Sequence, residues 1–401
     1  MNIRDQFPSL KRKINGKSVV YLDGPAGTQV PQRVIDAISD YYKTSNANTH
    51  GQFASSHETD QMIQEVRNKL AVFLGAESAD CISFGQNMTT LNYSLSRAIG
   101  RVLQPGDEIL ITQLDHEANR GPWLALRENG VVVREVRMQP NGTLDYDDMA
   151  NKLNERTRLV AMGYASNLFG TVNEVEKVRD MTYQNGSWLL LDAVHAAPHM
   201  TMDVGAVDCD FLLCSAYKFY GPHVGILYAR PGLLDSLPTD RLRTQEQHAP
   251  YSIETGTLNH AAITGVGAAI DFIASLGNGP NLSAHLLTGM AFIHHHEKEL
   301  FHRLVSGLLN VRQVKIYGPS YDTWPRCPTV SFSVESSTAS RVCRTLANEG
   351  IFAWDGHFYA IRATEVLGQI MFGGFVRMGL AAYSNLEDVE RTIEVMKKNY
   401  D

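Results

Sequence analysis

The segments LLLDAVHAAPH, at residues 189–199, and DFLLCSAYKFYGP, at residues 210–222, decide the fold. Each contains a short run that is apolar throughout, which is typical of a strand buried on both faces of a parallel sheet. Asp192 ends the first run, and Lys218 follows the second. Ligands of open α/β sheets bind at the carboxyl ends of the strands. We therefore expect Asp192, His195 and Lys218 to face one crevice.

Similar apolar runs recur over the first two-thirds of the chain and alternate with amphipathic stretches. The strand candidates are Cys81–Phe84, Glu108–Thr112, Val131–Val136, Arg158–Tyr164, Trp188–Ala193, Asp210–Ala216 and Gly225–Arg230. This alternation predicts an α/β domain with a large, mostly parallel seven-stranded sheet. Only residues 217–224 separate the last two strands. Because a parallel pair needs a longer crossover, that pair is expected to be antiparallel.

Helix signals lie on both sides of these strands. Pro31 is placed at a helix start, where proline is favoured. Ser55-x-x-Glu58 has the spacing of a capping box, and so has Ser384-x-x-Glu387 before the last predicted helix. Between them, residues Pro280–Leu309 are predicted to form one long helix.

The pattern of the sequence changes near residue 260, where short strands and helices replace the regular alternation of apolar runs and amphipathic stretches. We therefore expect a large domain over residues 20–260. A small α+β C-terminal domain over residues 261–401 is expected to include the N-terminal residues 1–19.

The 401-residue chain carries 36 Lys and Arg against 43 Asp and Glu, a formal net charge of −7. Mild acidity argues against a nucleic-acid partner, because phosphate binding needs a basic surface. No stretch approaches the roughly 20 apolar residues of a transmembrane helix. Residues 1–17 lack the apolar core of a signal peptide. We expect a cytoplasmic protein without nucleic-acid or membrane partners.

Neither cysteines nor histidines predict a metal site. The cysteines, at positions 81, 209, 214, 327 and 343, are odd in number and form no C-x-x-C pair, so buried reduced thiols are expected. In the run His294–Glu297, consecutive helical residues point about 100° apart and cannot converge on one ion. A solvated helix face is expected there.

Gly265 and Gly267 resemble part of a dinucleotide-binding fingerprint. They are interpreted as helix-packing positions, because a third glycine and a preceding strand are missing.

The lysine and the aspartate together suggest a specific chemistry. Burial would lower the pKa of Lys218, so that its neutral amine can form a Schiff base with an aldehyde. A buried Asp192 can hold the proton on a pyridinium nitrogen. Pyridoxal 5′-phosphate (PLP) requires both groups. A solvated lysine at a strand end and a helix-capping aspartate explain the same pair about equally well.

Two further segments follow predicted strands. Asn87, Met88 and Thr89 precede a helix, whose first backbone N–H groups form an anion site to which Thr89 adds a hydroxyl. An imidazole at His116 could lie flat on a cofactor ring and shuttle protons. An ordinary helix N-cap and a structural histidine are the alternatives.

Six motifs occur in the order and spacing of class V aminotransferases. They are YLDGPAGTQVP from Tyr21, DHEANRGPW from Asp115, ASNLFGTVN from Ala165, LLLDAVHAAPH from Leu189, SAYKFYGPHVGILYA from Ser215 and IETGTLN from Ile253. The chain resembles that family from about Tyr21 to Tyr383, and looks most like its cysteine desulfurase and selenocysteine lyase branch. The resemblance implies the type I fold of PLP-dependent transferases and PLP as the cofactor.

The resemblance also implies a role for each matching residue. Lys218 matches the lysine that forms the internal aldimine, Asp192 the acid on the pyridine nitrogen, and His116 the histidine stacked on the ring. The matches to the phosphate site are Asn87, Met88, Thr89 and Ser215, and the matches near the substrate carboxylate are Asn167 and Arg377. Thr257 matches a phosphate contact donated by the other subunit, which implies a homodimer with a shared active site.

The chain departs from the family pattern at functional positions. His195 stands where the family has Gln beside the phenolic oxygen of the cofactor, and either side chain can donate a hydrogen bond there. The family pattern G-I-x-x-R-x-G-H-H-C-A reads GIFAWDGHFYA at residues 350–360. Trp354 replaces the Arg, and Tyr359 replaces the persulfide-forming Cys. Both are expected to contact substrate, and Trp354 favours one larger or more apolar than cysteine.

The missing thiol bears on the reaction. Desulfuration needs a thiolate that attacks the substrate sulfur, so we hypothesise an amino-acid-converting PLP enzyme that is not a conventional desulfurase. Transamination, C–S or C–Se lyase chemistry and epimerisation all stay open. A non-catalytic regulatory protein is the other alternative, and it predicts decay of cofactor residues that are intact here.

Overall fold

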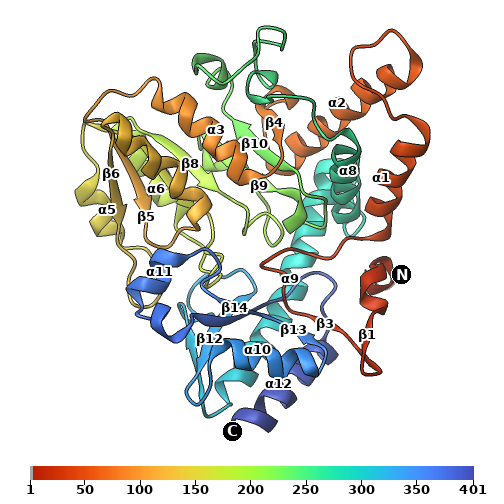
Figure 1. Cartoon of the computed structure of the whole chain (residues 1–401), viewed down its shortest axis with the longest axis vertical. Helices are drawn as coiled ribbons and strands as arrows, with labels where there is room; N and C mark the ends of the chain where they lie inside the picture. Colours follow the sequence, from red (N-terminus) through yellow and green to blue (C-terminus); the bar gives the residue numbers. More distant parts are fainter. Residues whose placement is uncertain (1–2) are drawn as a thin grey trace.

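The computed structural model describes residues 3–401 and shows a large domain and a small domain. The large domain (upper half of Figure 1) contains a seven-stranded sheet in the order β4-β10-β9-β8-β7-β5-β6. Its strands are β4 (Ile82–Gly85), β5 (Glu108–Thr112), β6 (Val132–Val136), β7 (Thr157–Gly163), β8 (Trp188–Asp192), β9 (Phe211–Ser215) and β10 (Gly225–Ala229). The fold prediction is confirmed, including the number of strands.

Strand directions also follow the prediction. The neighbours from β6 to β9 run parallel, whereas β10 is antiparallel to both β9 and β4. Successive residues of β8 belong to different cores: Leu189 and Leu191 face one, and Leu190 faces the other. A strand covered on both faces therefore needs apolar residues at every position, which is why its sequence does not alternate.

Helices cover both faces of this sheet. On one face lie α2 (Ala54–Leu74), α6 (Val175–Asn185), α7 (Val204–Val207) and α8 (His260–Ala274), and on the other lie α3 (Met88–Gly100) and α4 (Gly121–Leu124). The helices α1 (Gln32–Thr44) and α5 (Tyr146–Lys152) complete the domain. An added Cβ at Gly265 would lie 2.8 Å from Ile38, and one at Gly267 would lie 2.8 Å from Val66. These glycines are helix-packing positions, as predicted.

Two predicted helix N-caps, Ser55 and Ser384, lie one or two residues away from the observed N-cap positions. Pro31 precedes α1 as expected, but α2 begins at Ala54 after Phe53 and has no side-chain cap. The last helix, α12 (Leu386–Tyr400), has a capping box made by Asn385 and Asp388, one residue later than predicted. The hydroxyl of Ser384 instead accepts a hydrogen bond from the backbone of the preceding turn.

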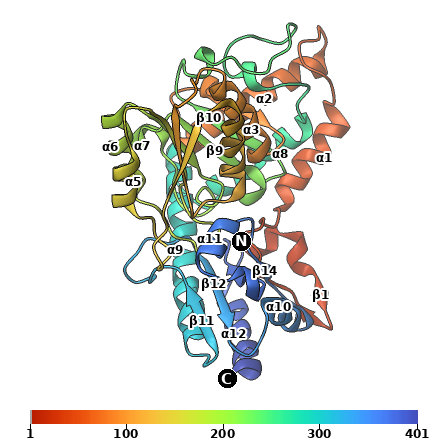
Figure 2. The ribbon, with the colours of Figure 1, turned by 60° about the vertical axis from the view of Figure 1, so that its left-hand side comes forward.

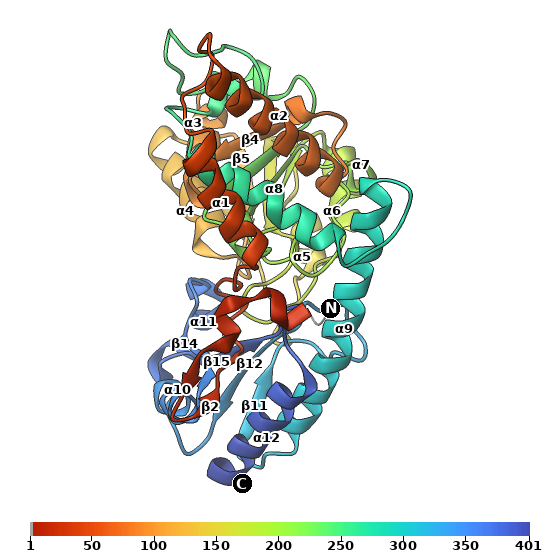
Figure 3. The ribbon, with the colours of Figure 1, turned by 90° about the vertical axis from the view of Figure 1, so that its right-hand side faces the viewer.

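The small domain has a separate core and a four-stranded antiparallel sheet in the order β11-β12-β15-β14. Its elements are β11 (Val314–Tyr317), β12 (Thr329–Val334), α10 (Ala339–Asn348), β13 (Ile351–Phe352), β14 (Trp354–Gly356), α11 (Ile361–Val366) and β15 (Phe375–Gly379). From the N-terminal segment come the hairpin β1 (Lys13–Ile14) and β2 (Lys17–Ser18), and β3 (Val20–Tyr21), which pairs with β13. Residues near both chain ends thus build this domain (Figure 3).

The long helix α9 (Leu282–Leu309) runs from one domain to the other, as Figure 3 shows. Its residues up to Ile293 belong to the core of the large domain, and those from Leu300 onward belong to the core of the small domain. We therefore propose α9 as the junction of the domains. The predicted boundary at residue 260 coincides with the start of α8, which packs on α1 and α2.

The helix α11 lies where the two domains meet (Figures 1 and 2). Among residues 3–401, none of the helices combines the length and the apolar character needed to span a bilayer.

Candidate active site

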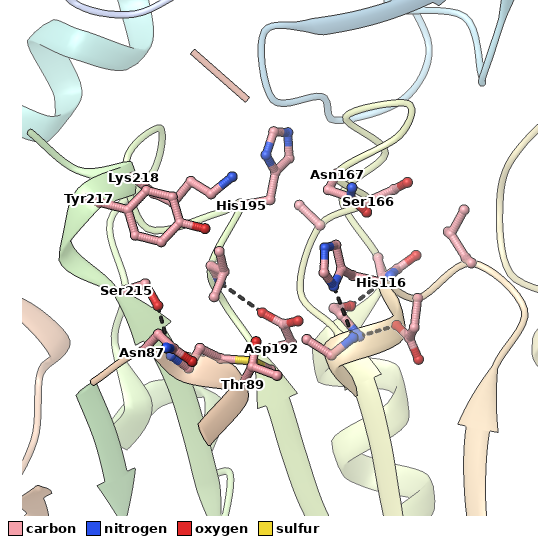
Figure 4. Close-up of a pocket in the computed structure, with 18 residues that line it drawn as sticks. Asn87, Thr89, His116, Ser166, Asn167, Asp192, His195, Ser215, Tyr217 and Lys218 are labelled. Atoms are coloured by element: carbon pink, nitrogen blue, oxygen red, sulfur yellow. Dashed lines mark hydrogen bonds between the residues drawn. The ribbon is translucent and has the colours of Figure 1, made fainter. Parts of the chain in front are cut away.

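One cavity, lined by residues of the large domain, lies at the carboxyl ends of β5, β7, β8 and β9 (Figure 4). The predicted residues that line it are Asn87, Met88, Thr89, His116, Asn167, Asp192, His195, Ser215 and Lys218. In the view of Figure 4, Asp192 lies below His195, with Lys218 to the left and His116 to the right. The crevice expected from strand ends is therefore present.

Lys218 follows β9 on a single 3-10 turn and is buried. Its Nζ donates a hydrogen bond to the carbonyl oxygen of Pro25, in the N-terminal segment. Burial, assisted by the positive charge of Arg377 and opposed by Asp192, lowers the pKa of Lys218 to about 7. The amine is therefore neutral in a large fraction of molecules near neutral pH, as a nucleophile or base requires.

Asp192 is the last residue of β8 and is also buried. Its Oδ1 accepts a hydrogen bond of 3.0 Å from the backbone N–H of Val194. Burial raises the pKa of Asp192 to about 6, although that hydrogen bond and Lys218 counteract it. A cationic N–H bound beside this carboxylate would stabilise its ionised form. The residue thus fits the pyridinium nitrogen of PLP.

His116 faces the cavity from the loop after β5. Its Nδ1 accepts a hydrogen bond of 3.0 Å from the backbone N–H of Ala118, which leaves the proton on Nε2. Burial, followed by the charges of Lys218 and Arg377, lowers the pKa of His116 to about 3. The ring is therefore neutral and can lie against a cofactor ring.

The preceding Asp115 was missed as a site residue, although it belongs to the same DHEANRGPW motif. Its two oxygens accept hydrogen bonds from the backbone N–H groups of Gly163, at 2.6 Å, and Thr112, at 3.1 Å. The residue thus ties the end of β5 to the end of β7. Burial raises the pKa of Asp115 to about 7. Other cavity residues that the prediction omitted include Ser166, Asn173, Val194 and Tyr217.

The turn before α3 has the geometry of an anion site. Asn87 caps the helix through a capping box with Thr90, and the hydroxyl of Ser215 accepts a hydrogen bond of 2.9 Å from Met88 N–H. Gly225 packs so closely on this turn that an added Cβ would lie 2.4 Å from the carbonyl carbon of Asn87. The N-cap and the anion site are compatible, since the helix N-terminus attracts a phosphate in either case.

Arg377 reaches this region from β15 of the small domain. Its Nη1 donates a hydrogen bond of 2.8 Å to the carbonyl oxygen of Asn167, and its guanidinium lies 4.1 Å from the ring centre of Phe358. The side-chain amide of Asn167 donates in turn to the carbonyl oxygen of Phe358, at 2.8 Å. Burial lowers the pKa of Arg377 to about 9.

Two of the three residues that depart from the family pattern lie outside the cavity lining. Trp354 pairs with Arg377 across the small sheet but is 52% exposed and does not line the cavity. Tyr359 is 66% exposed, and its ring centre lies 5.3 Å from that of His116. Phe358 and Tyr359 have φ angles of 51° and 59°, a costly conformation for bulky residues.

Thr257 does not line the cavity that contains Lys218. It lines a separate hollow, together with residues such as Asn48 and His50. The cysteines do not line the cavity either: all five are free and buried, and the nearest in sequence to a cavity residue, Cys214, directly precedes Ser215. Burial raises the pKa of Cys209 and of Cys343 to about 12.

The run His294–Glu297 is only partly solvated, so that prediction is wrong for Glu297. This residue is 1% exposed, and its Oε2 lies 2.8 Å from Nδ1 of the equally buried His199. Position 297 of α9 faces the domain junction, which the local sequence does not reveal. Within residues 3–401, no group of three His, Cys, Asp or Glu side chains could hold a metal ion.

Fold and cavity together define a PLP-dependent enzyme. The family model described as Aminotransferase class-V matches residues 20–392, and the chain belongs to this family. A cysteine desulfurase from Serratia proteamaculans is 33% identical over 99% of this chain and 97% of its own length. A probable cysteine desulfurase from Synechocystis is 31% identical, with 98% and 94% covered.

The solved structures agree with this assignment. The apo structure of a cysteine desulfurase from Thermococcus onnurineus superposes with a TM-score of 0.89 at 27% identity, and covers 99% of this chain and 96% of that one. The chain is thus cysteine desulfurase-like, and it is an enzyme of transferase or lyase type that uses PLP.

We predict that Lys218→Met stabilises the cofactor-free protein. The folded state of the wild type binds fewer protons at Lys218 than the unfolded state between pH 7 and pH 10.5, so removing the amine should raise the unfolding free energy by roughly 3–5 kcal/mol at pH 7. The unfolding free energy of the wild type rises with pH through this window, so the difference between the variant and the wild type should shrink toward pH 10.5. Denaturant unfolding of both proteins across this pH range measures that difference. The exposed Lys43→Met is the control, and an equal gain there would contradict the prediction.

Proposed function

We propose that this enzyme moves the α-proton of an amino acid with Lys218 as the base, and that it does not form a persulfide. One observation carries the proposal. The cavity joins a buried lysine of lowered pKa, a buried aspartate and a neutral histidine, and contains no thiol. PLP, when bound, stores the electrons that the broken C–H bond releases.

The residues of the cavity have complementary tasks in holding the cofactor. Asp192 would pair with the pyridinium nitrogen, and His116 would lie against the ring. The phosphate would be held at the start of α3 by the N–H of Thr89 and by the hydroxyl of Ser215, which accepts from the N–H of Met88 and can donate its own proton. Asn87 shapes this turn as the helix cap. His195 would donate a hydrogen bond to the phenolic oxygen.

The substrate binds from the small-domain side. Arg377 presents a planar guanidinium beside the cavity and accommodates the α-carboxylate, while Asn167 holds the neighbouring loop in place. The exposed ring of Tyr359 lies beside His116, and that of Trp354 is on the strand residue paired with Arg377, so both offer aromatic surface on the small-domain side of the cavity. These contacts favour an amino acid with a side chain larger or more apolar than that of cysteine.

The absence of persulfide chemistry follows from the thiols. Sulfur transfer needs a thiolate that can reach the substrate. Each of the five cysteines is buried outside the cavity, and burial raises the pKa of every one of these thiols. At the entrance itself Tyr359 presents a phenol, which cannot accept a sulfur atom.

Proton exchange in heavy water tests the base. We expect PLP-loaded wild type to replace the α-proton of its amino-acid substrate by deuterium, because Lys218 returns a solvent-derived proton to the α-carbon. Proton NMR of a panel of amino acids, both apolar and sulfur-containing, would show the loss of the α-proton signal and so identify the substrate. Lys218→Ala should abolish the exchange. A wild type that exchanges none of the panel would contradict the proposal.

Incubation with cysteine tests the sulfur chemistry. Mass spectrometry should find no added sulfur on any cysteine of the wild type, whereas Tyr359→Cys should gain one sulfur atom on the introduced thiol, which lies beside His116. Tyr359→Ser removes the ring without adding a thiol and should stay unmodified. A sulfur adduct on the wild type would sink this part of the proposal.

We propose further that the active site is shared in a homodimer. Thr257 lines a hollow separate from the cavity of its own chain, and its match to a phosphate contact from a second subunit supports this arrangement. The hollow would then lie at the subunit interface.

Mixing two inactive variants tests the sharing. Lys218→Ala removes the base, and Thr257→Glu places a carboxylate against the phosphate. If Thr257 acts on the partner's site, half of the dimers in an equal mixture are hybrids with one intact site, so about one quarter of the wild-type exchange activity should return. A mixture that stays inactive, although hybrids form, would show that both residues serve the same chain's site.

A further inference from the structure

One carboxylate, that of Glu135, connects the two domains beside the cavity. Glu135 lies on β6, the edge strand of the large sheet, and its Oε1 accepts a hydrogen bond from Nη2 of Arg120. Its other oxygen, Oε2, accepts a hydrogen bond of 3.0 Å from Nε of Arg362, the second residue of α11 in the small domain. Glu135 therefore binds one guanidinium from each domain, at the place where α11 meets the large domain (Figure 1).

Arg120 ties this carboxylate to the segment that carries His116. It directly follows the 3-10 turn that His116 caps, and it is 3% exposed. Besides Glu135, its guanidinium binds the side chain of Glu117, at 3.1 Å, and the carbonyl oxygen of Thr112 at the end of β5. A planar guanidinium that is buried and bound to three partners has little freedom to move. The position of Glu135 is thus fixed relative to His116.

Arg362 lies just after the small-domain loop that touches the same 3-10 turn. In this loop Phe358 and Tyr359 have positive φ angles, which persist only where the surroundings hold them. The carbonyl oxygen of Tyr359 accepts a hydrogen bond of 2.8 Å from the backbone N–H of Glu117, and α11 begins two residues further on. The ion pair of Arg362 with Glu135 therefore anchors the end of a strained segment.

The charges of this cluster keep it assembled. Burial by itself would raise the pKa of Glu135, but the hydrogen bonds and charges of Arg120 and Arg362 outweigh it, so the pKa is lowered and the carboxylate is ionised. The side chains of Glu135 and Arg362 are 23% and 38% exposed, so water screens their attraction only in part. Glu365 also binds Arg362, at 3.1 Å, but it belongs to α11 itself and cannot connect the domains.

We propose that Glu135 and Arg362 are positioning residues, whose ion pair seats α11 on the large domain and so keeps the loop with Tyr359 against the turn that His116 caps. The inference rests on the proposed function in one respect, because this loop borders the side from which we propose that the substrate binds. Loss of the ion pair would loosen the loop and α11, while the residues at the strand ends of the large sheet stay in place.

Amide hydrogen exchange of the PLP-loaded enzyme, followed by mass spectrometry, tests the contact without turnover. In Arg362→Met, which keeps an unbranched stem but removes the charge, peptides covering residues 113–120 and 355–366 should exchange roughly three- to fivefold faster, as expected for a partly exposed ion pair. Arg362→Lys keeps the charge and should retain most of the protection. Glu365→Gln removes the other partner of Arg362 and is the matched control, which should exchange like the wild type.

A double-mutant cycle assigns the effect to Glu135. Glu135→Gln keeps an oxygen that can accept from Arg120, and in this background Arg362→Met should add little further exchange, because its partner carboxylate is already gone. With the substrate that α-proton exchange identifies, Arg362→Met should raise KM by a factor similar to the gain in amide exchange, at nearly unchanged kcat, because the groups that move the proton are untouched. A loss of stability alone would not raise KM.

The inference is overturned if Arg362→Met exchanges like the wild type in both peptides, or if Glu365→Gln loosens them equally. It is also overturned if Arg362→Met has the same effect with and without Glu135, or if it leaves KM unchanged. Failure of the proposed function is separate: it would show as absent α-proton exchange in the wild type, and amide exchange would still decide whether the ion pair holds the loop.

Discussion

The burial of an amine and a carboxylate side by side, without a direct ion pair, is the constraint on which this structure depends. Lys218 and Asp192 lie at the same edge of the sheet, because Lys218 follows β9 and Asp192 is the last residue of the adjacent parallel strand β8. Their burial brings the pKa of Lys218 to about 7 and that of Asp192 to about 6. Such desolvation is unfavourable in the absence of a ligand, so the large apolar cores on both faces of the sheet must offset it. A cofactor with a pyridinium and an aldehyde relieves both costs.

The small domain adds charged and aromatic residues around the cavity that the large sheet forms. It supplies Arg377, whose charge contributes to the lowered pKa of Lys218 and of His116. Its loop after β14 places Phe358 and Tyr359 in the left-handed region, where hydrogen bonds from Asn167 and from the backbone N–H of Glu117 hold it. The strain lies where the two domains touch around the cavity. Function is thus coupled to how the small domain is seated.

Much of this architecture could be predicted because its signals are local. Strands buried on both faces appear as apolar runs, and the order of the cofactor motifs then placed Lys218, Asp192 and His116 in one crevice. The errors concern features that neighbours decide. The N-cap of α12 is Asn385 and not Ser384, because the hydroxyl of Ser384 accepts a hydrogen bond from the preceding turn. Glu297 sits among solvated residues in sequence, but helix α9 turns it toward His199. Thr257 lines a separate hollow, and no local signal reveals what it faces in an assembly.

If Tyr359 stands in place of a sulfur-accepting thiol, as we propose, two properties of the desulfurase-like scaffold are separated. Under this proposal proton transfer depends on Lys218, Asp192 and His116, all of which belong to the large domain and line one cavity. Sulfur transfer would depend on a loop of the small domain that contacts the cavity from outside. Because the two sets of residues lie on different domains, the loop can change chemistry while the proton-transfer groups remain intact. Under the proposed function, the reaction that remains after such a change ends at the carbon atoms of the substrate.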